Sequence, residues 1–358
     1  MVPPDLASPA LALPRPTDRW IRDLTFDGVF LLGSTLLVFV VASLFAAKSG
    51  GTSVLQLTGA SEALNLVIPV MLGGPHIFFS VVRTYMDVDF KREHRQLLRM
   101  TPHLVAFSMM YLVFHRHFDV VANVVLYSAV FHGAAQLAHI GLRYRQKAGR
   151  APYDLAGKAF LVSVLLGPFA FLSQAIQTRN FVFINQPIYK FLAPDWLIYL
   201  SGGTALVCAA YWLADTINHR RSGGRTNWRE GAILLATQGA FWFLANLDQI
   251  DVTFQAYNAW HSVQALGIMW LAMNDKWRGG KIRGPKQTGF CRDGAFKRTY
   301  VFGVLFSLSI GVLIILFSNF EMRDLTTSPF YYVFAVTVLL NHHAIDYWLF
   351  FGKRAFDY

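Results

Sequence analysis

Long apolar runs, separated by short stretches rich in charge, dominate the hydrophobic pattern of this 358-residue chain. A helix needs about 20 such residues to cross the hydrocarbon core of a bilayer. We therefore predict an all-α, polytopic transmembrane helix bundle of about ten spans. The predicted spans lie near residues 26–47, 64–86, 98–114, 118–142, 155–174, 195–215, 229–247, 254–274, 299–318 and 328–351.

The composition supports this interpretation, because hydrophobic residues make up 54% of the chain and charged residues only 15%. Soluble domains carry roughly 25% charged residues. We therefore exclude a soluble protein and expect the lipid bilayer as the main partner. Cys208 and Cys291 are the two cysteines, too few for a disulfide framework or a cysteine metal motif.

The formal net charge of +11 has a distribution that indicates membrane topology rather than nucleic-acid binding. Most Lys and Arg residues fall in the two tails and in every second loop, as cytoplasmic segments do. These basic segments are 15–22, 91–99, 143–158, 220–229, 276–298 and 353–354. We predict a cytoplasmic tail over 1–25, one transmembrane bundle over 26–351 and a cytoplasmic tail over 352–358, in a bacterial inner membrane.

On the opposite side of the predicted membrane, the segment 178–194 is amphipathic and rich in aromatic residues. Such a segment can rest in the membrane interface. We expect it either to lie there or to cover a cavity.

Six of the eleven histidines lie inside predicted spans, where ionisable groups are costly and usually mark a site or a pathway. They are His76, His132, His139, His261, His342 and His343. The other five lie at span ends or in loops, where interfacial water satisfies them.

Four of the buried histidines share a depth. The spans that contain them all run in the same direction, and eleven residues separate His76, His132 and His342 from the next charged residue at the inner surface. That separation is roughly 16 Å along a helix, and His261 lies about one turn higher. Neutral imidazole is the common ligand of iron, copper and zinc. Unrelated core histidines, each bonded to a carbonyl or hydroxyl, are the alternative; the shared depth favours a metal site.

Polar neighbours of these histidines could support a metal, because ligating histidines usually donate their second N–H to a carboxylate, amide or carbonyl. Asp346 follows His342 by one helical turn, and Gln136 follows His132 by one turn. These two are our candidate catalytic residues. Additional candidates are Asn258 and Gln264 beside His261, Arg83 beyond His76, and the extra histidines His139 and His343. Arg83 could instead pair with Asp87, and His139 lies about 10 Å below His132.

The order of the histidine segments resembles that of a known family. The segments GGPH at His76, FHGAAQ at His132, WHSVQALGIMW at His261 and NHHAIDYWLF at His342 are similar to the four histidine motifs of the bacterial membrane β-carotene dioxygenases, the Brp/Blh family. The resemblance implies a histidine-bound iron centre and cleavage of a lipid-soluble polyene by dioxygen. The chain departs from the family pattern at three places. The family has an Asp shortly after its first histidine, where this chain has Ile77 to Ser80, and another after its second histidine, near the position of Gln136. Ala265 stands where the third motif of the family has a second histidine.

We therefore predict a membrane oxygenase with non-haem iron, or another transition metal, bound by His76, His132, His261 and His342, acting on a hydrophobic, carotenoid-like or lipid-like small molecule. One alternative is a transporter or proton-coupled carrier that uses the buried His and Asp residues. Another is a membrane protein that binds haem or quinone through paired histidines. Phosphate-binding loops, nucleophile elbows and zinc-protease motifs are not apparent in the sequence, which argues against nucleotide and hydrolytic chemistry.

Overall fold

The computed structural model describes residues 20–45, 67–183, 186–190, 194–247, 250–282, 284–292, 294–317 and 329–351. Within these ranges the helices and one small hairpin are the regular elements, joined by turns and loops. The predicted tails 1–25 and 352–358 fall outside the described residues, except for residues 20–25.

The first half of the chain forms helices α1 (Leu24–Phe26), α2 (Leu36–Phe45), α5 (Gly74–Thr84), α6 (Val88–Glu93), α7 (Arg95–Phe114), α8 (Phe118–Lys147) and α9 (Leu155–Thr178). The second half forms α10 (Asp195–Arg221), α11 (Trp228–Ala245), α12 (Ile250–Arg278), α13 (Pro285–Cys291), α14 (Ala295–Phe317), α15 (Pro329–Tyr331) and α16 (Thr337–Phe351). A 3₁₀ segment, η2 (Gly33–Thr35), precedes α2, and wider π-helical turns form η1 (Asp27–Leu32), η3 (Pro69–Gly73) and η6 (Tyr332–Val336).

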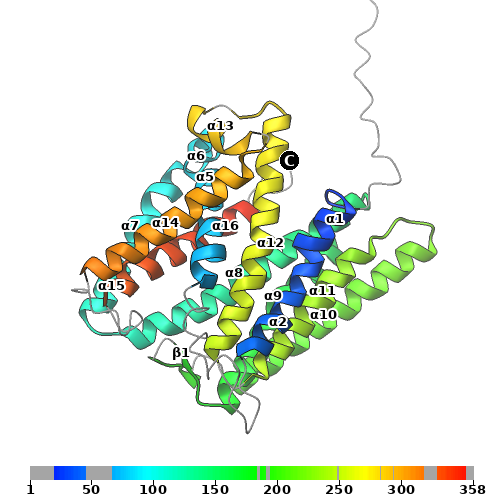
Figure 1. Cartoon of the computed structure of the whole chain (residues 1–358). Coiled ribbons are helices and arrows are strands. Elements are labelled where there is room, and N and C mark those ends of the chain that lie inside the picture. The colour runs from blue at the N-terminus through cyan, green and yellow to red at the C-terminus, as the bar shows by residue number, and fades with distance from the viewer. Residues whose placement is uncertain are drawn as a thin grey trace, which may run out of the picture.

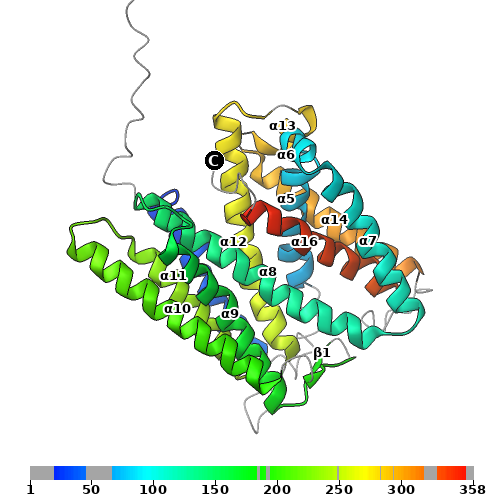
Figure 2. The ribbon, with the colours of Figure 1, turned by 180° about the vertical axis from the view of Figure 1, so that it is seen from behind.

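Helices α8 and α12 form the centre of the bundle (Figures 1 and 2). Helix α8 packs against α9, α11 and α16, whereas α12 packs against α2 and α5. Helices α10 and α14 lie further out, α10 against α9 and α14 against α5. In its most apolar window α8 is 72% buried and α10 only 17%, so α10 presents most of its apolar surface outward.

Six of the described helical segments are long and apolar enough to cross a membrane. They are Leu24–Leu44, Arg95–Phe114, Phe118–Lys147, Leu155–Thr178, Asp195–Arg221 and Ala295–Phe317. The chain is therefore an all-α integral membrane protein. Among the described residues, each of the ten predicted spans overlaps a helix, but ten crossings and cytoplasmic termini stay predictions.

Two elements lie where the sequence predicts loops. In the segment 178–194, strands β1 (Val182–Phe183) and β2 (Gln186–Pro187) pair in antiparallel fashion. The Asn123 side chain of α8 holds this hairpin, because it donates to the Pro187 carbonyl and accepts from the Tyr189 N–H. In the basic loop 276–298, helix α13 is fastened by Gln287, which donates to Asp87 together with Lys276.

Candidate metal centre

Four helices bring one histidine each to a common point. His76 lies on α5, His132 on α8, His261 on α12 and His342 on α16. Each offers a ring nitrogen, and these four nitrogens all lie within 4.8 Å of one another. The side chains are 3–6% exposed, so the cluster is closed to bulk water. We call these four residues the histidine centre.

The four rings lie against one another. His76 and His342 have ring centroids 4.4 Å apart, and His261 lies 4.7 Å from both His76 and His132, all edge to face. Two nitrogens on one ion, each at about 2.1 Å from it, stand at most about 4.2 Å apart. The most widely separated pair therefore has to close by about 0.6 Å for two ligands on opposite sides of one ion, and by more for a tetrahedral set.

The histidine centre also has unused hydrogen-bonding capacity. Within the described chain, the buried Nε2 atoms of all four histidines, and Nδ1 of His342, have no hydrogen-bond partner. Buried polar atoms normally find such partners, since each one left unpaired costs about 1–3 kcal/mol. Four unpaired nitrogens that converge from four helices can hold a metal ion, and an ion would satisfy all of them together.

Small residues explain how α5 brings His76 into the centre. A Cβ atom at Gly74 would lie 1.6 Å from the Ser307 hydroxyl, and one at Gly303 would lie 2.4 Å from Pro75 Cα. Helices α5 and α14 can therefore approach this closely only because glycine occupies both positions. The π-helical turn η3 ends directly before Gly74, and such turns are frequent at functional sites.

Asp346 lies beside the histidine centre, on the helix of His342, and is fully buried. Its Oδ1 lies 3.5 Å from His342 Nδ1 and its Oδ2 lies 4.0 Å from His76 Nε2. The Ser80 hydroxyl donates to Oδ2 at 3.1 Å and so fixes the carboxylate. The structure thus brings Asp346 to two of the four histidines, where it can orient a ligand or act as one.

The candidate amides bond to backbone carbonyls or to a serine hydroxyl. Gln136 donates to the His261 carbonyl at 3.2 Å and so ties α8 to α12. Gln264 donates to the Leu31 carbonyl, and Asn258 accepts from Ser262. These contacts support the helices that carry the histidines.

Arg83 is 8% exposed and lies on α5 below His76. The carboxylate of its predicted partner, Asp87, accepts from Lys276 and Gln287. Burial tends to raise the pKa of Asp87, but these hydrogen bonds lower it below the usual value. Asp87 therefore joins α12 and α13 beneath the histidine centre.

The two extra histidines differ from the four. His139 Nδ1 lies 3.0 Å from the Phe350 carbonyl, consistent with the prediction that it is too low to share the ion. His343 stacks on His132 with centroids 4.4 Å apart, and its Nδ1 lies 3.1 Å from the Ser128 hydroxyl. His343 therefore lies next to the histidine centre, as a neighbour of His132.

Sequence reasoning missed two residues that contact the centre. Ser80 lies one helical turn after His76, and Tyr257 lies one turn before His261, so the spacing that identified Asp346 could have identified both. The Tyr257 ring lies parallel to that of His261 at 5.6 Å, and its hydroxyl donates to the Ala129 carbonyl at 2.6 Å.

Comparisons with known proteins found no matching family model, no matching curated protein and no matching solved structure.

Proposed function

We propose that this protein is a membrane oxygenase whose histidine centre holds a non-haem iron ion. The convergence of four buried histidines, whose Nε2 atoms have no partner within the described chain, carries the proposal. Four imidazoles suit iron, copper and zinc alike. The resemblance of the four histidine segments to those of membrane dioxygenases is what favours iron.

In this proposal the ion supplies the redox chemistry that dioxygen requires, and the chain supplies the rest. His76, His132, His261 and His342 hold the ion, while Asp346, held by Ser80, orients His342 or completes the ligand set. Gln136 keeps α8 and α12 in register. The surrounding apolar helices exclude water and give a hydrophobic, carotenoid-like or lipid-like substrate access from the bilayer.

Ring packing supports an ion over haem. The edge-to-face contacts at 4.4–4.8 Å leave room for an ion among the nitrogens, and a flat macrocycle would have to separate the rings. A haem protein would also have a Soret band, which non-haem iron lacks.

The decisive experiment measures metal content and the absorption spectrum of the full chain, purified in detergent after expression with added iron. We expect about one iron per chain in the wild type without a Soret band. His132→Ala should lose nearly all of it, whereas His103→Ala, at an exposed site on α7, should retain it.

The iron-loaded protein is then supplied with carotenoids or other lipids, and dioxygen consumption is measured. Consumption that depends on His132 supports the oxygenase. A metal-free wild type overturns the metal proposal and directs attention to transport assays, and stoichiometric zinc overturns the assignment of iron.

A further inference from the structure

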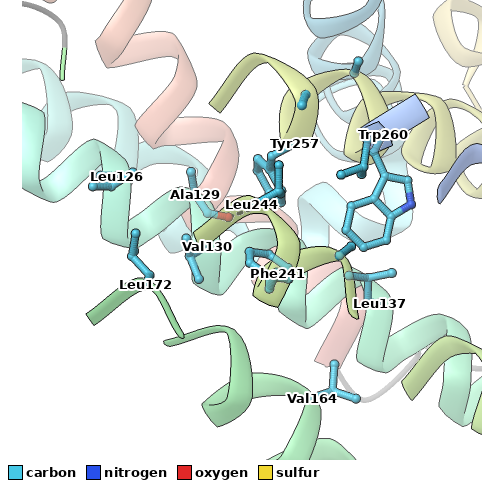
Figure 3. Close-up of a cluster of buried hydrophobic side chains, with 14 of the residues drawn as sticks. Leu126, Ala129, Val130, Leu137, Val164, Leu172, Phe241, Leu244, Tyr257 and Trp260 are labelled. Carbon is cyan, nitrogen blue, oxygen red and sulfur yellow. Dashed lines mark hydrogen bonds between the residues drawn. The ribbon is translucent and has the colours of Figure 1, made fainter. Parts of the chain in front are cut away.

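An apolar cavity lies next to the histidine centre, between α8, α9, α11 and α12. Its volume is about 30 Å³, and its lining includes Leu126, Ala129, Val130, Leu172, Leu244 and Tyr257. Figure 3 shows these side chains together in one hydrophobic cluster. Nothing in the proposed iron-binding role uses this cavity.

Tyr257 forms a wall shared by the cavity and the histidine centre. The Tyr257 ring is parallel to the His261 ring, with an angle of 5° between the two planes. Tyr257 also lines the cavity. Ala129 and Val130 line the cavity on α8, within one turn of His132. The cavity is therefore one aromatic ring away from the nitrogens.

Glycine allows Tyr257 to take this place. A Cβ atom at Gly133 would lie 1.7 Å from the Tyr257 hydroxyl. The absence of a side chain at the residue after His132 therefore lets the hydroxyl reach the Ala129 carbonyl. The same close contact fixes both the ring beside His261 and the wall of the cavity.

The chemistry of the cavity selects a small apolar occupant. Its two hydroxyl groups are already used, since Tyr257 donates to Ala129 and Thr253 donates to the Leu244 carbonyl at 3.2 Å. Apolar cavities stay dry and bind apolar molecules such as xenon. A volume of about 30 Å³ suits a diatomic gas.

We propose that this cavity holds dioxygen beside the histidine centre, with Tyr257 as the wall between them. The inference rests on the proposed oxygenase function for the identity of the gas. The existence of a gas site can be tested without that function.

The first test uses xenon as the probe, in crystals of the full chain under xenon pressure. Xenon should appear between Leu126, Leu172 and Tyr257 in the wild type and equally in metal-free His132→Ala. Leu172→Phe, which fills the cavity from α9, should remove it. The matched control is Leu206→Phe on α10, where the side chain is 72% exposed and outside the cavity.

The second test measures steady-state kinetics against dioxygen concentration. Leu172→Phe should raise the KM for dioxygen about fivefold with unchanged kcat and iron content, and Leu206→Phe should behave as the wild type. If Leu172→Phe does not fold, Ala245→Leu, at another residue of the lining, fills the same cavity from α11. A wild-type KM in a folded, filled variant overturns the proposal.

Other outcomes are equally decisive. A cavity without xenon, or one occupied by a lipid or detergent chain, overturns the gas site. If the wild type holds xenon in the cavity but binds no iron, the apolar gas site exists and the proposed oxygenase function has failed. Dioxygen as the occupant of the cavity is then overturned as well.

Discussion

Helix α8 carries two clusters of buried polar side chains, and they differ in how fully they are paired. Near its middle, His132 belongs to the histidine centre, whose Nε2 atoms have no partner in the described chain. Near its C-terminal end, fully buried Arg145 donates to both carboxylate oxygens of Asp154, to Glu230 and to the Ala151 carbonyl. All three of its side-chain nitrogens are thus bonded.

This difference in pairing indicates which cluster holds the fold together and which can bind a ligand. A paired network holds helices together and needs nothing from outside, and the Arg145 cluster joins α8 to the start of α9 and to α11. An unpaired network of the same burial costs stability unless a ligand completes it. The histidine centre can therefore hold a metal ion, whereas the Arg145 cluster is a structural joint.

The largest expected effect on stability comes from removing the Arg145 guanidinium. Arg145→Met should lower the free energy of unfolding by about 3–5 kcal/mol, because it leaves the buried Glu230 without its ion-pair partner and removes one of the two guanidinium groups beside Asp154. Thermal and chemical unfolding in detergent measures this loss. The iron content per folded chain should not change in Arg145→Met. His132→Ala should show the opposite result, because it loses iron but keeps its fold.

Arg92→Met provides the control for this comparison. Arg92 is 71% exposed and pairs with Asp89 at 3.4 Å on the surface. Surface pairs contribute roughly 0–1 kcal/mol, so its melting temperature should barely move. Equal destabilisation by the two variants would contradict the structural role of Arg145.

A smaller effect is expected from the carboxylate beside the histidine centre. Asp346→Asn should weaken iron binding by about 10–100-fold, because it removes the charge next to His342 and His76. Chelator competition on the purified protein measures the affinity. Asp195→Asn, in the exposed first turn of α10, should keep the wild-type affinity.

The close contact between α5 and α14 gives the next effect. Gly303→Ala places a methyl group against the Pro75 backbone and should cost about 1–3 kcal/mol, with partial loss of iron as His76 is displaced. A Cβ atom at Gly311, on the same helix, would have no neighbouring atom within 4 Å, so Gly311→Ala should have neither effect. Melting temperature and iron content together test the pair, and equal behaviour would contradict the role of the contact.

The smallest expected effect is a pH dependence in the Arg145 cluster. Burial tends to raise the pKa of Asp154, but the hydrogen bonds from Arg145 and Gly157 and the charge of Arg150 lower it below its usual value. Its stabilisation is therefore present above the unfolded-state pKa of about 3.9 and is lost as the pH falls through the lower folded-state pKa.

Asp154→Asn isolates this charge, because Asn also caps a helix well. Unfolding curves of the wild type and Asp154→Asn should differ at pH 7 and converge in acid below about pH 4. A gap that stays constant with pH would mean that the carboxylate charge does not stabilise the fold.

Sequence alone could predict the helices and the convergence of the four histidines. Residue counting along each helix gives depth, so His76, His132 and His342 could be placed at one level without a structure. Counting says nothing about which helices are neighbours. The contact between Ser80 and Asp346, far apart in the chain, depends on that arrangement and could not be predicted from local pattern.

Helix ends were harder to predict where charge is buried. The sequence placed the end of the fourth span at residue 142, whereas α8 continues to Lys147. Arg145 looks like a loop residue by composition, yet Asp154 and Glu230 neutralise it inside the bundle. Hydropathy analysis treats every charged side chain as exposed. Arg145 is buried instead, because Glu230, distant in the sequence, pairs with it.

Helix α14 contributes no histidine, yet it touches the centre through Gly303 and Pro75. Its most apolar window is only 11% buried, so most of its surface meets lipid tails. Lateral pressure in the bilayer acts directly on such a helix, and the residue that it presses against immediately precedes His76. Any displacement of α14 against α5 is therefore transmitted first to the residue beside His76.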